Sequence, residues 1–233
     1  MALIEKAKGR RKNQSPSGYT RLFGIPEMGQ LMSRVQGTTI SAGTELERMI
    51  WQRVRQIEDF DQFIHSIYLP IQEPDPDKRL WVACKKQYKA SKIIHSEYEP
   101  DFLGFNLEKR ICYVVEVKDG DQFDTKKSAG EHTTIHNFTN ETSSALPFTT
   151  EIYICSFNAR TKEEIFAGLK GKFALNEIMT GKEFCDLFSI DFDEIVKTRT
   201  SDQQGNLEYF VKELLIINPI RNMIRKILNA FKD

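Results

Sequence analysis

Two apolar runs flank a short polar turn: EPDFLGF at residues 99–105 and ICYVVEVK at residues 111–118. Both runs are rich in aromatic and β-branched residues, which is the pattern of a β-hairpin. Because successive side chains of a strand point to opposite faces, Glu116 and Lys118 should project from one face of the second strand. Asp101 begins the first strand and lies across from Glu116 if the hairpin register permits. The sequence therefore predicts two carboxylates and a lysine at one end of a two-stranded ribbon.

The segments around this hairpin predict a mixed sheet flanked by helices. A helix is expected over 44–65, because apolar residues recur there at helical spacing and Ser41 or Thr44 can cap it. A second helix is expected over 126–141, and a largely apolar, buried strand over 150–157. Hairpin, helix and strand in this order predict an α/β fold with α+β character and a crossover connection in a central mixed β-sheet.

The remaining segments are less regular. Residues 80–94 are lysine-rich and of mixed character, compatible with a helix, and the prolines of residues 70–76 break regular structure. Pro219 should end one helix or start another. Helices are predicted in the C-terminal part at 161–169, 181–196 and 207–231.

Size and composition are those of an ordinary soluble protein. The chain has 233 residues with 40% hydrophobic and 28% charged residues, which suffices for one sizeable domain. Residues 1–18 carry five basic side chains between Lys6 and Lys12 and few apolar ones, so we expect a flexible basic arm. Such an arm either follows a DNA backbone or is a solvated terminus.

Charge, hydropathy and cysteine usage narrow the function classes. The 33 basic and 33 acidic residues balance, so a polyanionic partner is neither required nor excluded. No apolar run approaches the roughly 20 residues that span a bilayer, and the N-terminus lacks a secretory pattern, so we expect a cytoplasmic protein without membrane contact. The four cysteines form no Cys-x-x-Cys pair, which argues against a structural zinc site and for buried, unpaired side chains.

A known motif covers the hairpin. Pro100-Asp101, a gap of fourteen residues and Glu116-Val117-Lys118 together resemble the PD-(D/E)XK nuclease motif. The order of predicted elements over about residues 40–160 is similar to the common core of that superfamily. The size of the chain and the helix entry GTELE at residues 43–47 look most like type II restriction endonucleases. The resemblance implies one catalytic domain over 19–233, with a restriction-endonuclease-like core at about 40–160 and a helical C-terminal part at about 161–233.

The resemblance also implies a metal site with Mg²⁺ as cofactor. Asp101 and Glu116 would supply carboxylate ligands, and the main-chain carbonyl of Val117 is the usual additional ligand in the superfamily. Lys118 would position and help deprotonate the attacking water, or stabilise charge on the phosphate, and the sequence leaves both roles open. Members of the superfamily often place a helix glutamate beside the metal, and Glu47 is the candidate here.

The implied activity is sequence-specific endonuclease cleavage of double-stranded DNA, with 5′-phosphate and 3′-hydroxyl products, as in a type II restriction enzyme of a bacterial or archaeal cell. One alternative is a structure-specific repair or junction nuclease with the same core. Another is a non-catalytic DNA-binding module. Retention of Asp101, Glu116 and Lys118 argues against that module, because a decayed site usually loses one such residue.

DNA contacts are expected from basic and amide side chains near the active end of the hairpin, which can reach phosphates or base edges. His132 and His136 are four residues apart, a spacing that zinc proteases use, but the glutamate that follows the first histidine in those enzymes is absent. Either histidine could face DNA instead. The candidate DNA-binding residues are Lys126, Lys127, His132, Asn137, Asn158, Arg160 and Lys162.

The resemblance also implies a homodimer, because restriction enzymes of this type commonly act as two-fold symmetric dimers that match a palindromic DNA site. An apolar stripe near the C-terminus either forms the dimer contact or packs on the protein's own core. Its members are Ile216, Ile217, Ile220, Ile224, Ile227, Leu228 and Phe231.

Overall fold

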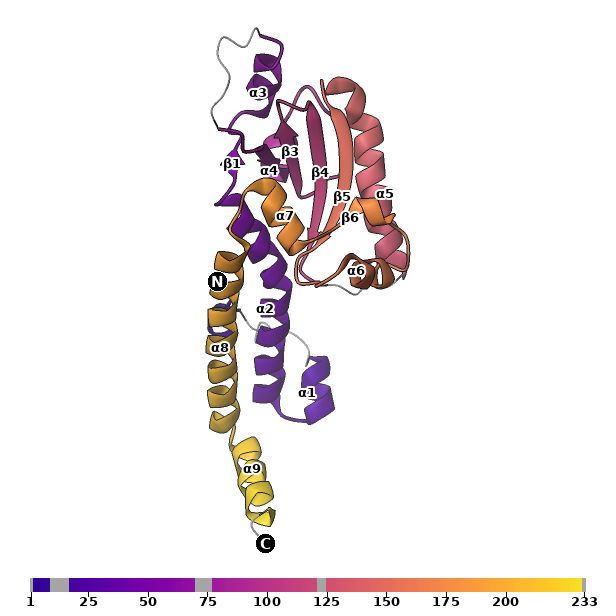
Figure 1. The fold of residues 1–233 in the computed structure, drawn as a ribbon. Helices are drawn as coiled ribbons and strands as arrows, with labels where there is room; N and C mark the ends of the chain where they lie inside the picture. Colours follow the sequence, from indigo (N-terminus) through magenta and orange to yellow (C-terminus); the bar gives the residue numbers. More distant parts are fainter. Residues whose placement is uncertain (1, 9–16, 70–76, 121–124, 232–233) are drawn as a thin grey trace. The chain divides into compact units, whose positions relative to one another are not determined.

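The computed structural model describes residues 2–8, 17–69, 77–120 and 125–231 (Figure 1). Residues 9–16 of the predicted basic arm and the proline-containing segment 70–76 lie outside the described residues. The chain divides into two compact units, Leu46–Phe192 and Met1–Glu45 with Asp193–Asp233. The first unit is built on a β-sheet and the second is helical.

A six-stranded mixed sheet among the described residues organises the larger unit, with the strands in chain order across the sheet. The β2–β3 and β3–β4 pairs are antiparallel, whereas the β1–β2, β4–β5 and β5–β6 pairs are parallel. This arrangement confirms the predicted fold class and the crossover between β4 and β5. The strands are β1 (Arg55–Gln56), β2 (Trp81–Cys84), β3 (Phe102–Asn106), β4 (Ile111–Lys118), β5 (Thr149–Ser156) and β6 (Ile178–Thr180).

Helices cover both faces of this sheet. Ile135 and Phe138 of α5 pack with Leu103, Val114 and other buried residues of one face into the main hydrophobic core. On the opposite face, the ring of Phe184 in α7 lies 6.2 Å from that of Phe102. The helices of this unit are α3 (Phe60–Ser66), α4 (Lys85–Tyr88), α5 (Thr125–Thr142), α6 (Lys162–Gly168) and α7 (Gly181–Phe188), with the 3-10 turns η2 (Ser143–Ala145) and η3 (Leu175–Glu177).

The alternation along β4 assigns its side chains to these two faces. Val114 packs in the core below α5, so Glu116, two residues further on, points to the same face. Val115 and Val117 point to the α7 face, where Gly104 of β3 leaves room for Phe188. A Cβ atom at Gly104 would lie only 2.8 Å from the Phe188 ring, so this position in the strand needs glycine.

The predicted helix over 44–65 is wrong. Helix α2 runs from Pro26 to Trp51, the chain then forms β1, and α3 starts at Phe60 after Asp59 accepts a hydrogen bond from the Gln62 N–H. The apolar spacing continues by coincidence through β1, whose residues pair with β2. Ser41 does not cap a helix, because it lies inside α2 and its hydroxyl donates to the carbonyl of Gly37.

Two further helix predictions need correction. The lysine-rich segment 80–94 contains the strand β2 and only the short helix α4, because Trp81–Cys84 pairs with both β1 and β3. The predicted helix over 181–196 is interrupted: α7 ends at Phe188, and Ser189 adopts a left-handed conformation with φ 57° before the next helix begins. The predicted start at Thr180 is confirmed, since its hydroxyl accepts a hydrogen bond from the Glu183 N–H.

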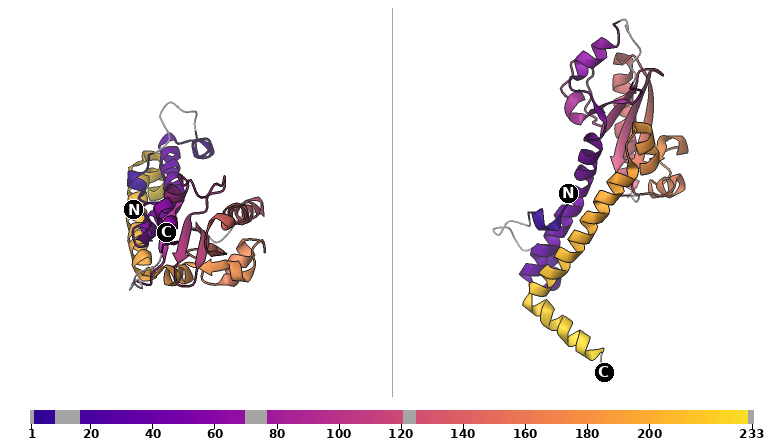
Figure 2. Two further views of the ribbon diagram at one scale, coloured as in Figure 1. Left: turned by 90° about the horizontal axis from the view of Figure 1, so that it is seen from above. Right: turned by 60° about the vertical axis from the view of Figure 1, so that its left-hand side comes forward.

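The smaller unit is helical, and α2 and α8 lie side by side in it (Figure 2). Ile4, Leu31 and Ile217 are buried together, and Tyr209 packs against them. Pro219 stands in the first turn of α9, which confirms the predicted helix break. The elements are η1 (Ile4–Lys6), α1 (Gly18–Phe23), the part of α2 (Pro26–Trp51) up to Glu45, α8 (Phe192–Ile216) from Asp193 onward, and α9 (Asn218–Ala230).

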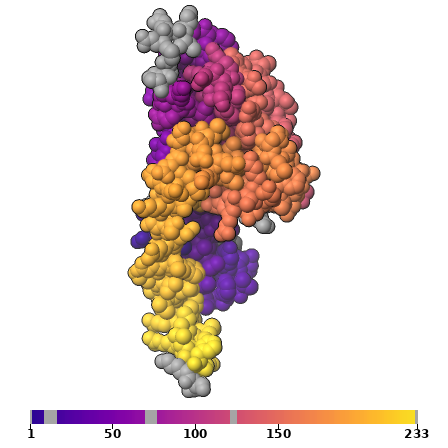
Figure 3. Space-filling view, viewed as in Figure 1, coloured from indigo at the N-terminus to yellow at the C-terminus, as the bar shows by residue number. Residues whose placement is uncertain are grey.

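Figure 3 shows surface formed by the C-terminal helices α8 and α9. Part of the apolar stripe that these helices carry is exposed. Ile216 is 69% exposed and Leu228 56% exposed, whereas Ile217 is buried in the core of the smaller unit. The predicted stripe is thus divided between core packing and exposure. In the part of the chain that the structure describes, every helix is too short or too polar to cross a bilayer.

Candidate active site

The hairpin register brings Asp101 and Glu116 together. Since Phe102 pairs with Val115, Asp101 lies opposite Glu116 at the end of the ribbon. The Asp101 N–H donates to Glu116 Oε2 at 3.2 Å, and the Val117 N–H donates to Asp101 Oδ2 at 2.8 Å. The two residues are only 4% and 5% exposed. The strand backbone therefore fixes two carboxylates next to each other in a nearly water-free position.

Lys118 occupies the same face of β4 as Glu116. Its Nζ lies 2.5 Å from Glu116 Oε1 and 2.9 Å from Glu131 Oε1 on α5. Burial alone would lower the pKa of the Lys118 ammonium, but the charges of Glu116 and Glu131 outweigh burial and raise that pKa. Glu131 is a residue that the sequence did not single out, because nothing in a mostly polar helix marks the turn that faces the hairpin.

Lys85, the first residue of α4, is a second addition to the site. Its Nζ lies 2.5 Å from Asp101 Oδ1. Burial opposes the charged form of Lys85, but Asp101 outweighs it and raises the pKa of this ammonium. The sequence prediction missed Lys85 because it treated residues 80–94 as compatible with a single helix. In the structure, Lys85 directly follows the end of strand β2, and this position brings its side chain to Asp101.

Tyr88 also supports the site from α4. Its hydroxyl donates to the carbonyl of Pro100, which directly precedes Asp101. The side chain is buried, and burial raises the pKa of the hydroxyl well above its ordinary value. Tyr88 therefore remains a neutral hydrogen-bond donor, and it fixes the backbone at Pro100 just before strand β3.

The electrostatics of the carboxylate pair favour a cation. Burial raises the pKa of Glu116 to about 7, and the neighbouring charge of Asp101 adds to this rise while Lys118 opposes it. Two adjacent buried carboxylates are costly as anions unless positive charge compensates them. Their oxygen atoms are the donor type that divalent cations such as Mg²⁺ prefer, so the residues present fit a metal ion.

Glu47, near the C-terminal end of α2 in the larger unit, comes within electrostatic reach of this pair. Burial raises the pKa of its carboxyl, and the charge of Asp101 raises it further. The ammonium groups of Lys85 and Lys118 oppose this rise. The structure thus places Glu47 within electrostatic reach of Asp101 and Lys118, although the helix that carries it has other bounds than predicted.

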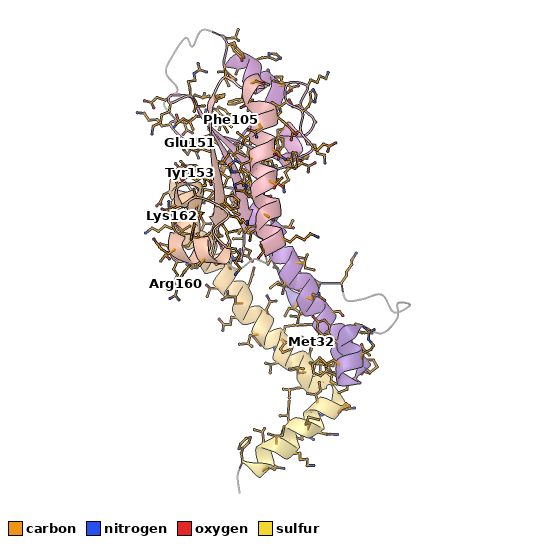
Figure 4. The ribbon with its side chains drawn as sticks, turned by 90° about the vertical axis from the view of Figure 1, so that its right-hand side faces the viewer. Met32, Phe105, Glu151, Tyr153, Arg160 and Lys162 are labelled. Atoms are coloured by element: carbon orange, nitrogen blue, oxygen red, sulfur yellow. The ribbon has the colours of Figure 1, made fainter. Side chains whose placement is uncertain are left out.

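The predicted DNA-contacting residues fall into two groups. Lys126, Lys127, His132 and Asn137 belong to α5, and the others follow β5. Arg160 precedes α6, and Lys162 is the first residue of that helix (Figure 4). The Nζ atom of Lys162 lies 3.3 Å from Glu183 Oε1.

Asn158 is already engaged within the protein. Its amide donates to the backbone carbonyl and to a carboxylate oxygen of Asp119, at 2.6 and 2.8 Å. This contact ties the end of β5 to the end of β4. Contact of any of these residues with DNA remains a prediction.

The mixed sheet and its covering helices form a restriction-endonuclease-like core, with a buried acidic pair at the end of a hairpin. The sequence is 42% identical over 230 residues to the type II restriction enzyme HhaII of Haemophilus parahaemolyticus, an alignment that covers 97% of this chain and 99% of that enzyme. The chain therefore belongs to the type II restriction enzymes, which are site-specific deoxyribonucleases. No protein-family model and no solved structure matches it.

Proposed function

We propose that Asp101, Glu116 and Lys118 form the hydrolytic site of a PD-(D/E)XK endonuclease that cleaves double-stranded DNA with Mg²⁺. The observation that carries this proposal is the buried acidic pair, which two backbone N–H groups hold in place beside a lysine. Type II restriction enzymes generally need a divalent metal ion, and Asp101 and Glu116 offer oxygen donors that suit one. Glu47 would complete it from α2.

Asp101, Glu116 and the main-chain carbonyl of Val117 would hold the ion. When bound, Mg²⁺ supplies positive charge that draws electron density from the phosphoryl group and lowers the pKa of a water molecule. The two carboxylates are preorganised by the strand backbone, so little conformational entropy is lost when they bind. Lys85 and Lys118 balance their charge before the ion arrives.

Lys118 would act on the reacting phosphate. As an ammonium between Glu116 and Glu131, it is oriented by two acceptors and can stabilise negative charge that develops on the phosphoryl oxygens. Water oxygen then bonds to phosphorus and the bond to the 3′-oxygen breaks, with a proton passing to that oxygen. The products are a 5′-phosphate and a 3′-hydroxyl.

The enzyme would act as a homodimer in the cytoplasm of its bacterial or archaeal cell, where its DNA substrate lies. Exposed apolar side chains on α8 and α9, including Ile227 and Phe231, supply a surface that a second copy could cover. Light scattering with and without DNA tests this part. A strict monomer under both conditions contradicts the dimer.

A digest of DNA of known sequence, followed by mapping of both ends of each product, tests the activity. We expect discrete fragments with Mg²⁺, none after chelation, and identical sequence at every cut. Cuts placed at branches or mismatches, irrespective of sequence, would indicate a structure-specific nuclease instead. Binding without any cleavage would indicate a non-catalytic module.

A further inference from the structure

A second group of metal-ligating side chains lies in the larger unit, outside the carboxylate site. His132 and His136 stand one turn apart on α5, and Glu177 ends the turn η3 just before β6. One ligand atom from each of these three residues lies within 4.8 Å of the others. The sequence pointed to the two histidines but not to Glu177, because only the packing of η3 against the sheet and α5 brings this carboxylate to them.

The two imidazole rings of the cluster are in contact with each other. Their centroids are 4.0 Å apart with an angle of 34° between the planes, and Phe173 meets His132 edge-on at 5.1 Å. His136 Nε2 is buried and makes no hydrogen bond to any residue in the described part of the chain. An unsatisfied buried ring nitrogen is costly, which indicates that a partner is missing.

Glu177 is oriented toward the histidines by its own hydrogen bond. Its Oε2 accepts from the Ala174 N–H at 2.8 Å, and its Oε1 lies 3.5 Å from His136 Nε2. Ligating carboxylates in metal sites are commonly fixed by an outer hydrogen bond of this kind. The simpler alternative is an ion pair between Glu177 and a protonated His136.

The distances within the cluster favour a metal over that ion pair. The 3.5 Å separation is too long for a strong hydrogen bond, whereas a cation between the two atoms would bridge it. The ring of His132 lies 4.0 Å from that of His136, so it supplies a further nitrogen donor beside these two atoms. Neutral imidazoles are the form that binds metal ions.

We propose that His132, His136 and Glu177 bind a divalent transition-metal ion of the Zn²⁺ type. Two imidazole nitrogens and a carboxylate oxygen suit such an ion and leave a fourth position for water, whereas Mg²⁺ prefers an all-oxygen site. The ion would join α5 to the segment that leads into β6. Because Glu131 precedes His132 and contacts Lys118, the same ion would also restrain the turn of α5 that faces the carboxylate site.

Titration calorimetry with Zn²⁺ tests the site, with millimolar Mg²⁺ present to occupy the oxygen-donor site. We expect the wild-type protein to bind one equivalent at the histidine cluster. His136→Ala and Glu177→Gln should weaken binding on the order of 100-fold or more, since even loss of an outer-shell partner costs about 10–100-fold. The exposed histidines outside the cluster provide matched controls, so His65→Ala and His95→Ala should bind as the wild type does.

Co²⁺ gives a second measurement that does not depend on the variants. The wild-type protein with Co²⁺ should show the visible absorption of a low-symmetry, nitrogen-containing site, and Zn²⁺ should displace it. Circular dichroism verifies that each variant is folded, and Glu177→Gln keeps the shape of the side chain if His136→Ala does not fold. Equal Zn²⁺ affinity in Glu177→Gln and His95→Ala, or the absence of a Co²⁺ spectrum, overturns the proposal.

Discussion

The carboxylate site and the histidine cluster use neighbouring residues of one helix for different purposes. Glu131 of α5 reaches Lys118, and His132 on the next position reaches His136. Asp101 and Glu116 of the first site are almost fully buried, and each contacts a lysine. The second site is half-buried and combines two imidazoles with one carboxylate. The comparison shows that the type of ligand atom, rather than the position in the fold, determines which metal ion each site suits.

The largest effect should come from the acidic pair. Asp101→Asn and Glu116→Gln should each reduce the DNA cleavage rate by at least about 10³-fold, because the cation loses a fixed anionic ligand. Single-turnover cleavage measures the loss, and DNA binding should remain. Glu108→Gln, in the exposed turn of the same hairpin, is the control and should cut like the wild type. Wild-type cleavage by Asp101→Asn contradicts the assignment.

The second-largest effect should be the pH dependence of stability that Glu116 of the carboxylate site causes. Burial raises the pKa of Glu116 from 4.5 to about 7 in the folded state, so the protein binds more protons folded than unfolded between these values. The stability associated with Glu116 is therefore complete below about pH 4.5 and is lost as pH rises through 7, by up to about 3 kcal/mol.

Urea unfolding of the metal-free protein from pH 5 to 8 measures this slope. Glu116→Gln should flatten the slope, and Glu108→Gln should leave it unchanged. The raised pKa of Lys118 does not enter, because that ammonium stays protonated throughout this range in both states. A wild-type and a Glu116→Gln slope that coincide would show that Glu116 is not desolvated.

Zinc should stabilise the protein through the histidine cluster alone. At a free Zn²⁺ concentration 100 times the dissociation constant, binding adds about 2.7 kcal/mol, which raises the melting temperature by roughly 5–10 °C in a chain of this size. Differential scanning calorimetry with Mg²⁺ in excess measures the shift. His136→Ala should lose most of this shift, while Glu116→Gln should retain it. A shift that disappears in Glu116→Gln instead would assign the zinc to the carboxylate site.

A substitution at Glu131 should give the smallest effect on cleavage, and it should distinguish the carboxylate site from the histidine cluster most clearly. Glu131→Gln should lower the cleavage rate by about 10-fold, because Lys118 loses one of its two charged acceptors but keeps Glu116. Zn²⁺ affinity should stay within two- to three-fold of the wild type, roughly the usual scatter of a neighbouring charge change. Unaltered cleavage would show that Glu131 does not orient Lys118.

Local patterns in the sequence predicted the acidic pair, whereas packing between distant segments decided the rest. The alternation along β4 and the position of Asp101 were sufficient to place Glu116 and Lys118, since these relations span one hairpin. Lys85 and Glu131 come from other elements, and no spacing relates them to the hairpin. Glu177 likewise meets His136 only because β6 joins the sheet beside β5.

The misassigned helix over 44–65 has a physical cause. Buried apolar residues such as Ile50 and Ile57 keep a helical spacing across the end of α2 and the strand β1. The periodicity could not reveal that Arg55 and Gln56 find hydrogen-bond partners in β2. The cap at Asp59 was the available local signal for a new helix start.

The backbone hydrogen bonds between Asp101, Glu116 and Val117 make the length of each strand a determinant of the chemistry. Extra residues in the exposed turn that follows Leu107 would leave the pairing of Phe102 with Val115 intact, so we expect this turn to tolerate insertions. One residue inserted within β4 would instead turn Glu116 and Lys118 toward the α7 face and bury their charges against Phe184 and Phe188. We therefore expect insertions to be tolerated in the turn of the hairpin, whereas an insertion within strand β3 or β4 should destroy the site.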